Sequence, residues 1–246
     1  MTAVQTYSYP IRPYHTGVNG RLFIYQLLNF LQDAAHKHAD GYGFGQLQLE
    51  NDNLFWVLSR LSIEIKALPK VGDEINLSTW VKSIRGAISE REFTIILGEN
   101  TIINASSLWF CLSGESHKPT RLPSTYIDLM IINNVYSFQG GSVKVSESEN
   151  IDQKSSGLET KAAYSDIDMV DHVNNATYIR WMMDELSQEF HLNKQLKQLD
   201  VNYLGECFLG DIVKVNHHSQ SGPTLQHEVA NEVSGKVICR ANSLWQ

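Results

Sequence analysis

The chain has 246 residues, of which 42% are apolar and 10% aromatic, which is enough for a sizeable core and excludes a disordered chain. Its net charge of −7 gives no support for general nucleic-acid binding, which needs a basic surface. The three cysteines, Cys111, Cys207 and Cys239, are too sparse for a disulfide framework or a zinc site, and we expect neither a metal nor a cofactor.

The first seventeen residues contain neither a basic stretch nor the apolar stretch of a secretory signal. No apolar run approaches the length of about 20 residues that spans a bilayer. We therefore expect a reduced, cytoplasmic protein without a membrane span.

In the first half, spaced tyrosine and isoleucine residues predict a strand within residues 6–16. An apolar stripe from Leu22 predicts a helix that ends near Ala39. Glycines recur in residues 40–45, and because they follow a helix rather than a strand they indicate a helix end and a mobile loop, not a phosphate-binding loop. Alternating residues then predict consecutive strands over 54–112, with a turn at 69–73, and one helical turn within 117–130.

Residues 137–158 are rich in Gly, Ser, Glu and Asn, a composition typical of a surface linker. A second helix is predicted after Asn174 or Asn175, either of which is suited to cap it. Apolar residues recur along it at helical spacing, namely Ile179, Met182, Met183, Leu186 and Phe190. We expect Trp181 and the two methionines to lie in the core.

The second half repeats the first. Three pairs of segments show the repeat, namely Val18-Asn19-Gly20 with Val173-Asn174-Asn175, 70–75 with 208–213, and 105–109 with 241–245. A strand, a long helix and a run of antiparallel strands therefore occur twice, which predicts an α+β fold of two fused domains, each a helix wrapped by an antiparallel sheet. We place the domains at 1–131 and 158–246, joined by a linker at 132–157.

Comparison of the two copies predicts a single active site. Counted from the two helix starts, His172 corresponds to Gly17 and Asp168 to Pro13. Counted from the two Gly-Asp turns, Glu206 corresponds to Leu68. Because each reactive residue then has an inert counterpart, we expect the chemistry in the second half only.

The segment Asp168-Met169-Val170-Asp171-His172-Val173-Asn174-Asn175, followed by Tyr178 and Trp181, resembles the motif D-x-N-x-H-V-N-N of the acyl-acyl-carrier-protein thioesterases. Glu206-Cys207 matches the Glu-Cys pair that the family has downstream. The resemblance extends through the first half, in Leu31-Gln32-Asp33-Ala34-Ala35 and Trp56-Val57-Leu58-Ser59-Arg60.

This resemblance implies two tandem hotdog domains and hydrolysis of fatty acyl thioesters on acyl carrier protein, which would be the partner. It implies that Asp168, His172 and Glu206 are catalytic. The family's asparagine is replaced by Val170, which cannot donate a side-chain hydrogen bond. Asp171, an adjacent asparagine or a water molecule would have to act in its place.

Thioester hydrolysis needs an activated water molecule and a stabilised oxyanion. We expect Glu206 to be the general base, and His172 with the N–H groups near Asn174 and Asn175 to polarise the carbonyl. Asp168 would orient His172 or serve as the second carboxylate. We expect the acyl pocket in the first half, near residues 21–38 and lined by Phe55 and Trp56. Arg180, Lys118 and Arg121 are candidate contacts to the acidic carrier.

Several alternatives remain open at this point. Cys207 could act as a thiolate nucleophile with His172 and Asp168 and form an acyl-enzyme, although its neighbouring carboxylate disfavours a thiolate. The substrate could be an acyl-CoA thioester, or the protein could bind acyl groups without turnover. A homodimer is also compatible with the sequence. The histidine pairs 36/38 and 217/218 do not share a face, so neither predicts a metal site.

Overall fold

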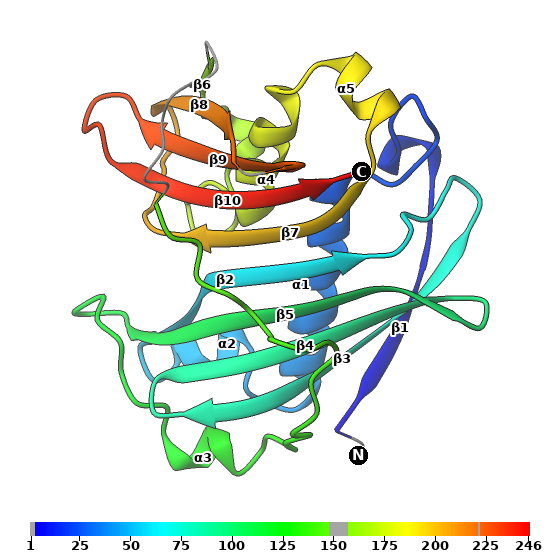
Figure 1. Ribbon diagram of the computed structural model, residues 1–246. Coiled ribbons are helices and arrows are strands. Elements are labelled where there is room, and N and C mark those ends of the chain that lie inside the picture. Colours follow the sequence, from blue (N-terminus) through cyan, green and yellow to red (C-terminus); the bar gives the residue numbers. More distant parts are fainter. Residues whose placement is uncertain (1–2, 148–156, 221) are drawn as a thin grey trace. The chain divides into compact units, whose positions relative to one another are not determined.

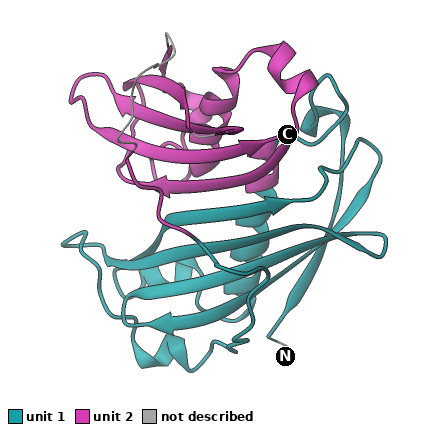
Figure 2. Ribbon diagram, in the orientation of Figure 1, with its two compact units in different colours: residues 1–23, 29–142 teal, residues 24–28, 143–246 magenta. Residues whose placement is uncertain are grey.

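A computed structural model describes residues 3–147, 157–220 and 222–246. The chain divides into two compact units (Figure 2). Unit 1 consists of Met1–Phe23 and Asn29–Ser142, and unit 2 of Ile24–Leu28 and Val143–Gln246. Each unit combines helices with an antiparallel sheet, so the predicted α+β class is confirmed. Part of the predicted linker, 148–156, lies outside the described residues.

Unit 1 contains an antiparallel sheet in the order β1-β3-β4-β5-β2 (Figure 1). Its strands are β1 (Gln5–Pro10), β2 (Leu54–Ile65), β3 (Glu74–Arg85), β4 (Ile88–Leu97) and β5 (Asn100–Ser113). The strand predicted within 6–16 ends at Pro10, and the short helix η1 (Pro13–His15) follows. Pro13 has no N–H to donate to a strand, and its fixed φ suits the start of a helical turn.

The long helix is α1 (Ile24–Gly41), whose residues from Asn29 onward belong to unit 1 and lie behind the strands of that unit in the view of Figure 1. Its side chains bond to the sheet, since the Tyr9 hydroxyl donates to Asp33 at 2.6 Å and the ring of His38 meets the Arg91 guanidinium at 3.2 Å. Unit 1 also contains α2 (Gln46–Glu50) and α3 (Ser124–Ile127).

The loop after α1 differs from the mobile segment that the glycines predict. Phe44 is 1% exposed, and its carbonyl accepts a hydrogen bond of 3.3 Å from the Trp56 indole. A buried aromatic side chain anchors this loop, because exposing it would cost about 2 kcal/mol of apolar burial.

The strands of unit 2 are antiparallel neighbours in the order β7-β10-β9-β8-β6. Its elements are β6 (Leu158–Lys161), η2 (Tyr164–Asp166), α4 (Asn175–Asp184), α5 (Gln188–Asn193), β7 (Leu196–Tyr203), β8 (Ile212–Ser219), β9 (Thr224–Asn231) and β10 (Val237–Trp245). Trp181 and Met182 are buried, as predicted, but the predicted helix is divided. Ser187 starts α5 by accepting the Phe190 N–H, so Phe190 belongs to a separate helix.

The internal repeat is present in the hydrogen bonds of the two units. Leu22 N–H donates to Pro69 O at 2.9 Å, and Val173 N–H donates to Cys207 O at 2.8 Å. In the same way, Ile11 exchanges bonds with the turn at 72–73, and Ala162 with the turn at 210–211. These bonds equate Leu22 with Val173, which is 151 positions later.

This equivalence corrects the register that the sequence predicts. The counterpart of His172 is Arg21, not Gly17 as predicted. The counterpart of Asp168 is Gly17, not Pro13. The bridge Thr16–Leu22 recurs as Ile167–Val173, and the positive φ of Gly20 (68°) recurs at Asp171 (62°). The predicted pairing of Glu206 with Leu68 is confirmed. The residues that follow them, Cys207 and Pro69, provide the carbonyls that accept the equivalent N–H groups of Val173 and Leu22.

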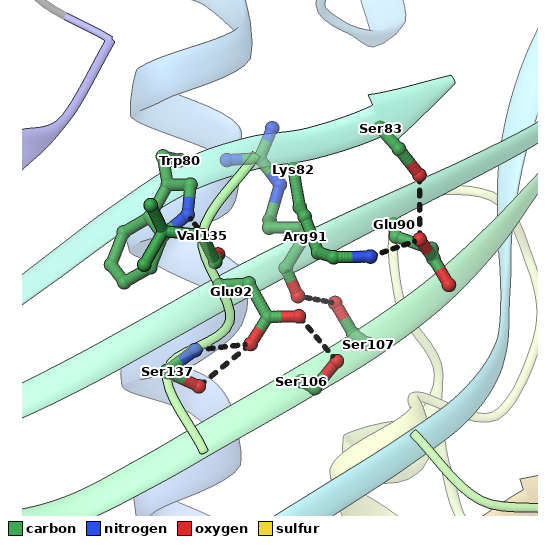
Figure 3. Close-up of polar contacts among 10 residues, drawn as sticks. All are labelled: Trp80, Lys82, Ser83, Glu90, Arg91, Glu92, Ser106, Ser107, Val135 and Ser137. Carbon is green, nitrogen blue, oxygen red and sulfur yellow. Dashed lines mark hydrogen bonds and ion pairs between the residues drawn. The ribbon is translucent and has the colours of Figure 1, made fainter. Parts of the chain in front are cut away.

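The predicted linker is bound to the sheets over the part that the structure describes. In unit 1, Glu92 is fully buried and accepts bonds from the Ser137 N–H (3.0 Å) and hydroxyl (2.7 Å) (Figure 3). Burial raises the pKa of Glu92. The Trp80 indole donates to Val135 O, and in unit 2 the Val145 N–H donates to Asn202. These hydrogen bonds anchor parts of the segment, while Val135 is 56% and Tyr136 is 50% exposed, and the linker stays a prediction.

Candidate active site

The loop that carries Asp168 and His172 is a tight hairpin between η2 and α4. Asp168 N–H donates to His172 O at 2.8 Å, and the Asp168 carboxylate accepts the Val170 N–H at 3.0 Å. Such a bond to the backbone two residues on is an Asx turn. Asp171 takes the left-handed conformation that closes the hairpin, which a short polar side chain tolerates better than most. Hydrogen bonds within the loop therefore fix the path of its backbone.

Asn174 is the N-cap of α4. Its side chain accepts the Ala176 N–H at 2.9 Å, and its carbonyl accepts the Thr177 N–H. A cap of this kind contributes about 1 kcal/mol to stability. Asn174 therefore caps the helix, and the substrate contact that we expect of it stays a prediction.

Asn175, the first residue of α4, offers a backbone donor instead. Its N–H makes no hydrogen bond to other described residues, whereas the N–H groups of Asn174, Ala176 and Thr177 each have an acceptor. It stands at the positive end of the helix dipole. An N–H group in this position is suited to an anionic oxygen.

Glu206 follows β7 and is tied to the start of α4 on both sides. The Tyr203 hydroxyl donates to Asn175 O at 3.2 Å, and Cys207 O accepts the Val173 N–H. Glu206 is distant from His172 in the sequence, but its Oε1 lies 3.9 Å from His172 Nδ1. The structure therefore brings these two predicted residues together.

The surroundings of His172 and Glu206 are partly open. The side chain of His172 is 31% exposed and that of Glu206 is 48% exposed. Phe208 lies edge to face against the His172 ring, with centroids 5.0 Å apart. An apolar ring therefore limits the motion of the imidazole, while both reactive groups stay accessible to a substrate and to water.

The catalytic role that we expect of Asp168 stays a prediction. Its carboxylate bonds to the loop backbone, and the group that faces the His172 ring is Glu206. Val170 lies at the loop tip, 47% exposed, beside the 79% exposed Met169. The hydrogen bond that Val170 makes to Asp168 uses its backbone N–H as the donor. Asp171 points to solvent, and its N–H bonds to Asp168 O.

Cys207 is buried and poorly suited to be a nucleophile. Its side chain is fully buried, and burial, with the nearby Asp211 carboxylate, raises the pKa of its thiol to about 12. The thiolate, which is the reactive form, would be about one molecule in ten thousand at pH 8.

We expect Cys207→Ala to keep kcat within about threefold of the wild-type value, because the thiol is uncharged and out of contact with solvent. We also expect mass spectrometry to find Cys207 unmodified after iodoacetamide treatment of the native protein at pH 8. Near-total loss of turnover in Cys207→Ala would restore the acyl-enzyme mechanism.

The two predicted acyl contacts lie on adjacent positions of β2, so their side chains point to opposite faces of the sheet. Trp56 packs against an apolar cluster of unit 1 that includes Phe44, Leu49 and Met130. Phe55 instead lies edge to face with His117 at 5.7 Å. The two side chains therefore lie on opposite faces of the sheet, and their contacts to an acyl chain stay predictions.

Sequence reasoning missed one feature near the site. Asp166 is 4% exposed and forms an ion pair with Arg180 of α4. The side chain of Arg180 is 34% exposed, and its contact with the carrier stays a prediction. An acidic residue two positions before Asp168, and an arginine on the following helix, were the available signals. Among the described residues, no three His, Cys, Asp or Glu side chains form a group that could hold a metal ion.

Comparisons with known proteins place relatives along nearly the whole chain. Residues 2–130 match the Acyl-ACP thioesterase N-terminal domain, and residues 149–246 match the Acyl-ACP thioesterase C-terminal domain. Oleoyl-acyl carrier protein thioesterase 2, chloroplastic, of Arabidopsis thaliana is 29% identical over 245 residues, which cover 92% of this chain. The chain spans 64% of the length of that relative.

Two solved structures are similar over nearly the whole chain. An acyl-ACP thioesterase from Bacteroides thetaiotaomicron VPI-5482 is 29% identical with a TM-score of 0.87, covering 99% of this chain and 98% of its own. The 12:0-ACP thioesterase from Umbellularia californica is 20% identical with a TM-score of 0.87, covering 100% and 98%, and shows the same fold. Because the two domain matches cover most of the sequence, this chain belongs to the acyl-ACP thioesterase family and has its hotdog fold.

Proposed function

We propose that the protein hydrolyses fatty acyl thioesters of acyl carrier protein. The observation that carries the proposal is the approach of His172 to Glu206, 3.9 Å apart beside the start of α4. Membership of the family supports it, as do the names of the relatives from Arabidopsis thaliana and Bacteroides thetaiotaomicron.

In the proposed reaction, the Glu206 carboxylate accepts a proton from a water molecule. The water oxygen forms a bond to the thioester carbon, and negative charge develops on the carbonyl oxygen. His172 and the N–H of Asn175 would stabilise that oxygen, because fixed donors need no reorganisation as the charge appears. The carbon–sulfur bond then breaks, the sulfur takes the proton from Glu206, and the fatty acid leaves.

The supporting role of Asp168 in this proposal is to hold the loop. Its carboxylate accepts the Val170 N–H, and its own N–H bonds to His172 O. These bonds fix the backbone from which the imidazole extends. The valine in place of the family's asparagine is compatible with this role, because the bond at that position uses the backbone.

We assign the acyl-binding contact of this proposal to Trp56 in unit 1. The cluster beside it contains mostly apolar side chains, and a fatty acyl chain needs such surroundings. The described residues contain no helix long and apolar enough to cross a membrane. All three cysteines are unpaired, which supports the prediction of a cytoplasmic location, while the plant relatives are named as chloroplastic. The homodimer also stays a prediction.

The experiment is hydrolysis by the purified protein of one acyl group presented on acyl carrier protein and on CoA, over a panel of chain lengths. We expect kcat/KM to be higher for the carrier-protein substrates. A preference for CoA would instead identify an acyl-CoA thioesterase. Tight binding of the acyl thioester without release of fatty acid would identify a non-catalytic acyl-binding protein and contradict the proposal.

A further inference from the structure

Asp166 and Arg180 form an ion pair in which the carboxylate is buried. The two residues flank the loop that carries Asp168 and His172. Asp166 is 4% exposed, and the side chain of Arg180 is 34% exposed. One carboxylate oxygen of Asp166 bonds to Arg180 Nη2, and the other accepts the Ala163 N–H at 2.9 Å. Both oxygens are therefore held, one by α4 and one by the chain before the loop.

The backbone of Asp166 extends this connection to the helix start. Its carbonyl accepts the Asn174 N–H at 2.8 Å. Asn174 caps α4, and Arg180 lies on that helix six positions later. Asp166 thus has two bonds to α4. Its backbone carbonyl bonds to the N-cap residue Asn174, and its side chain bonds to Arg180 in the second turn. The hairpin that carries Asp168 and His172 lies between Asp166 and Asn174, so the bond between these two residues closes it.

The first copy of the repeat has no such charge pair. With the offset of 151, Asp166 corresponds to His15 and Arg180 to Asn29. One of the two side-chain bonds is conserved between the copies. The ring nitrogen of His15 accepts the Arg12 N–H at 3.1 Å, just as the carboxylate of Asp166 accepts the Ala163 N–H. On the α1 side, His15 meets the Phe30 ring edge to face at 5.2 Å. The ion pair is therefore present in the copy that carries His172 and Glu206.

An attachment of this kind has a functional consequence beyond stability. A displacement of about 1 Å of a catalytic group can cost about 100-fold in rate, even when its cause lies outside the reacting atoms. Arg180 presents a planar guanidinium with several fixed donors, so it defines the direction of Asp166 better than a lysine would.

We propose that Asp166 and Arg180 form a positioning pair that holds the His172 loop against the start of α4. The proposal rests on the proposed function for its kinetic readout, and on the structure alone for its spectroscopic readout. Neither residue contacts the substrate in this role. Their effect on the reaction passes through the backbone of the loop to His172.

The test compares Arg180→Met, Arg180→Lys and the double variant Asp166→Asn/Arg180→Met with the wild type. The double variant removes both charges, so it keeps the test valid if Arg180→Met alone fails to fold because its buried carboxylate has lost its partner. Arg240→Met is the matched control, since Arg240 forms an ion pair with Glu228 between β10 and β9 of the same unit, with Nε and Oε1 2.8 Å apart.

We expect Arg180→Met, or the double variant in its place, to lower kcat by about 100-fold with KM within about threefold, at a temperature where the protein is folded. Arg180→Lys should restore part of the loss. Arg240→Met should lower the melting temperature and leave kcat unchanged. Equal values of kcat in all folded variants would show that the pair is merely structural and overturn the proposal.

The NMR signal of the His172 imidazole, assigned with His172→Ala, separates this proposal from the proposed function. We expect it to shift in the double variant and to stay in place in Arg240→Met. If the wild type hydrolyses no acyl thioester, the proposed function fails, and the imidazole signal still decides the positioning role. An unchanged imidazole signal in the double variant would overturn that role.

Discussion

Glu206→Gln is expected to lower kcat by about 1,000-fold or more, with KM close to the wild-type value. A general base contributes between about 100- and 10,000-fold to rate, and glutamine cannot accept the proton from water. The substitution keeps the size of the side chain, and Glu206 is 48% exposed, so we expect the fold to be unaffected. The measurement is steady-state release of fatty acid from acyl carrier protein, with circular dichroism to confirm folding.

Glu159→Gln provides the control for this result. Glu159 lies on β6 of the same unit and is also exposed, but no step of the proposed reaction uses it. We expect its kinetics to equal those of the wild type. If Glu206→Gln retained the wild-type rate, Glu206 could not be the general base. If it stopped turnover but left acyl-thioester binding intact, that would separate the chemical step from substrate binding.

His172→Ala is expected to lower kcat by about 100- to 1,000-fold, the range found when one donor to a developing oxyanion is removed. The reason is geometric. The imidazole is 3.9 Å from Glu206 and lies against the Phe208 ring, so it is placed to donate to the carbonyl oxygen of the same thioester whose carbon the activated water attacks. The measurement is kcat and KM with the acyl-carrier-protein substrate that gives the highest rate.

The combination of the two substitutions tests whether these residues act together. We expect the double variant Glu206→Gln/His172→Ala to be only slightly slower than Glu206→Gln, because catalytic residues that act as a unit give losses that do not multiply. Losses that multiply in full would show that His172 and Glu206 act independently. A His172→Ala variant with the wild-type kcat would remove His172 from the reaction.

Much of the fold follows from local patterns in the sequence. The period of two in β3 (Glu74–Arg85) places Ile75 and Leu77 on one buried face, and the period of 3.6 in α4 buries Ile179 and Met182. Each pattern involves neighbours in the chain, so the sequence predicts it directly. The end of the second helix was not predictable in this way, because the apolar spacing continues to Phe190 across the Ser187 cap.

The repeat was visible in the sequence, but its register was not. The similar segments at 18–20 and 173–175 are not structural equivalents, because the first lies in the hairpin and the second spans the start of α4. The true register follows from the hydrogen bonds of Leu22 and Val173 to segments far along the chain. Arg21 is therefore the counterpart of His172. A guanidinium has donors and no acceptor, and the counterpart of the proposed base Glu206 is Leu68, so the first copy lacks both reactive groups.

By itself, the sequence determined the α+β class, the duplication, and the family to which Asp168, His172 and Glu206 point. Only the tertiary structure decided what these residues contact. It brings His172 to Glu206, turns Asp168 toward the loop backbone, buries Cys207, and pairs Asp166 with Arg180. The physical reason is that patterning and capping depend on neighbours within about one helical turn. An ion pair or a pair of catalytic groups depends on where separate segments of the chain meet after folding.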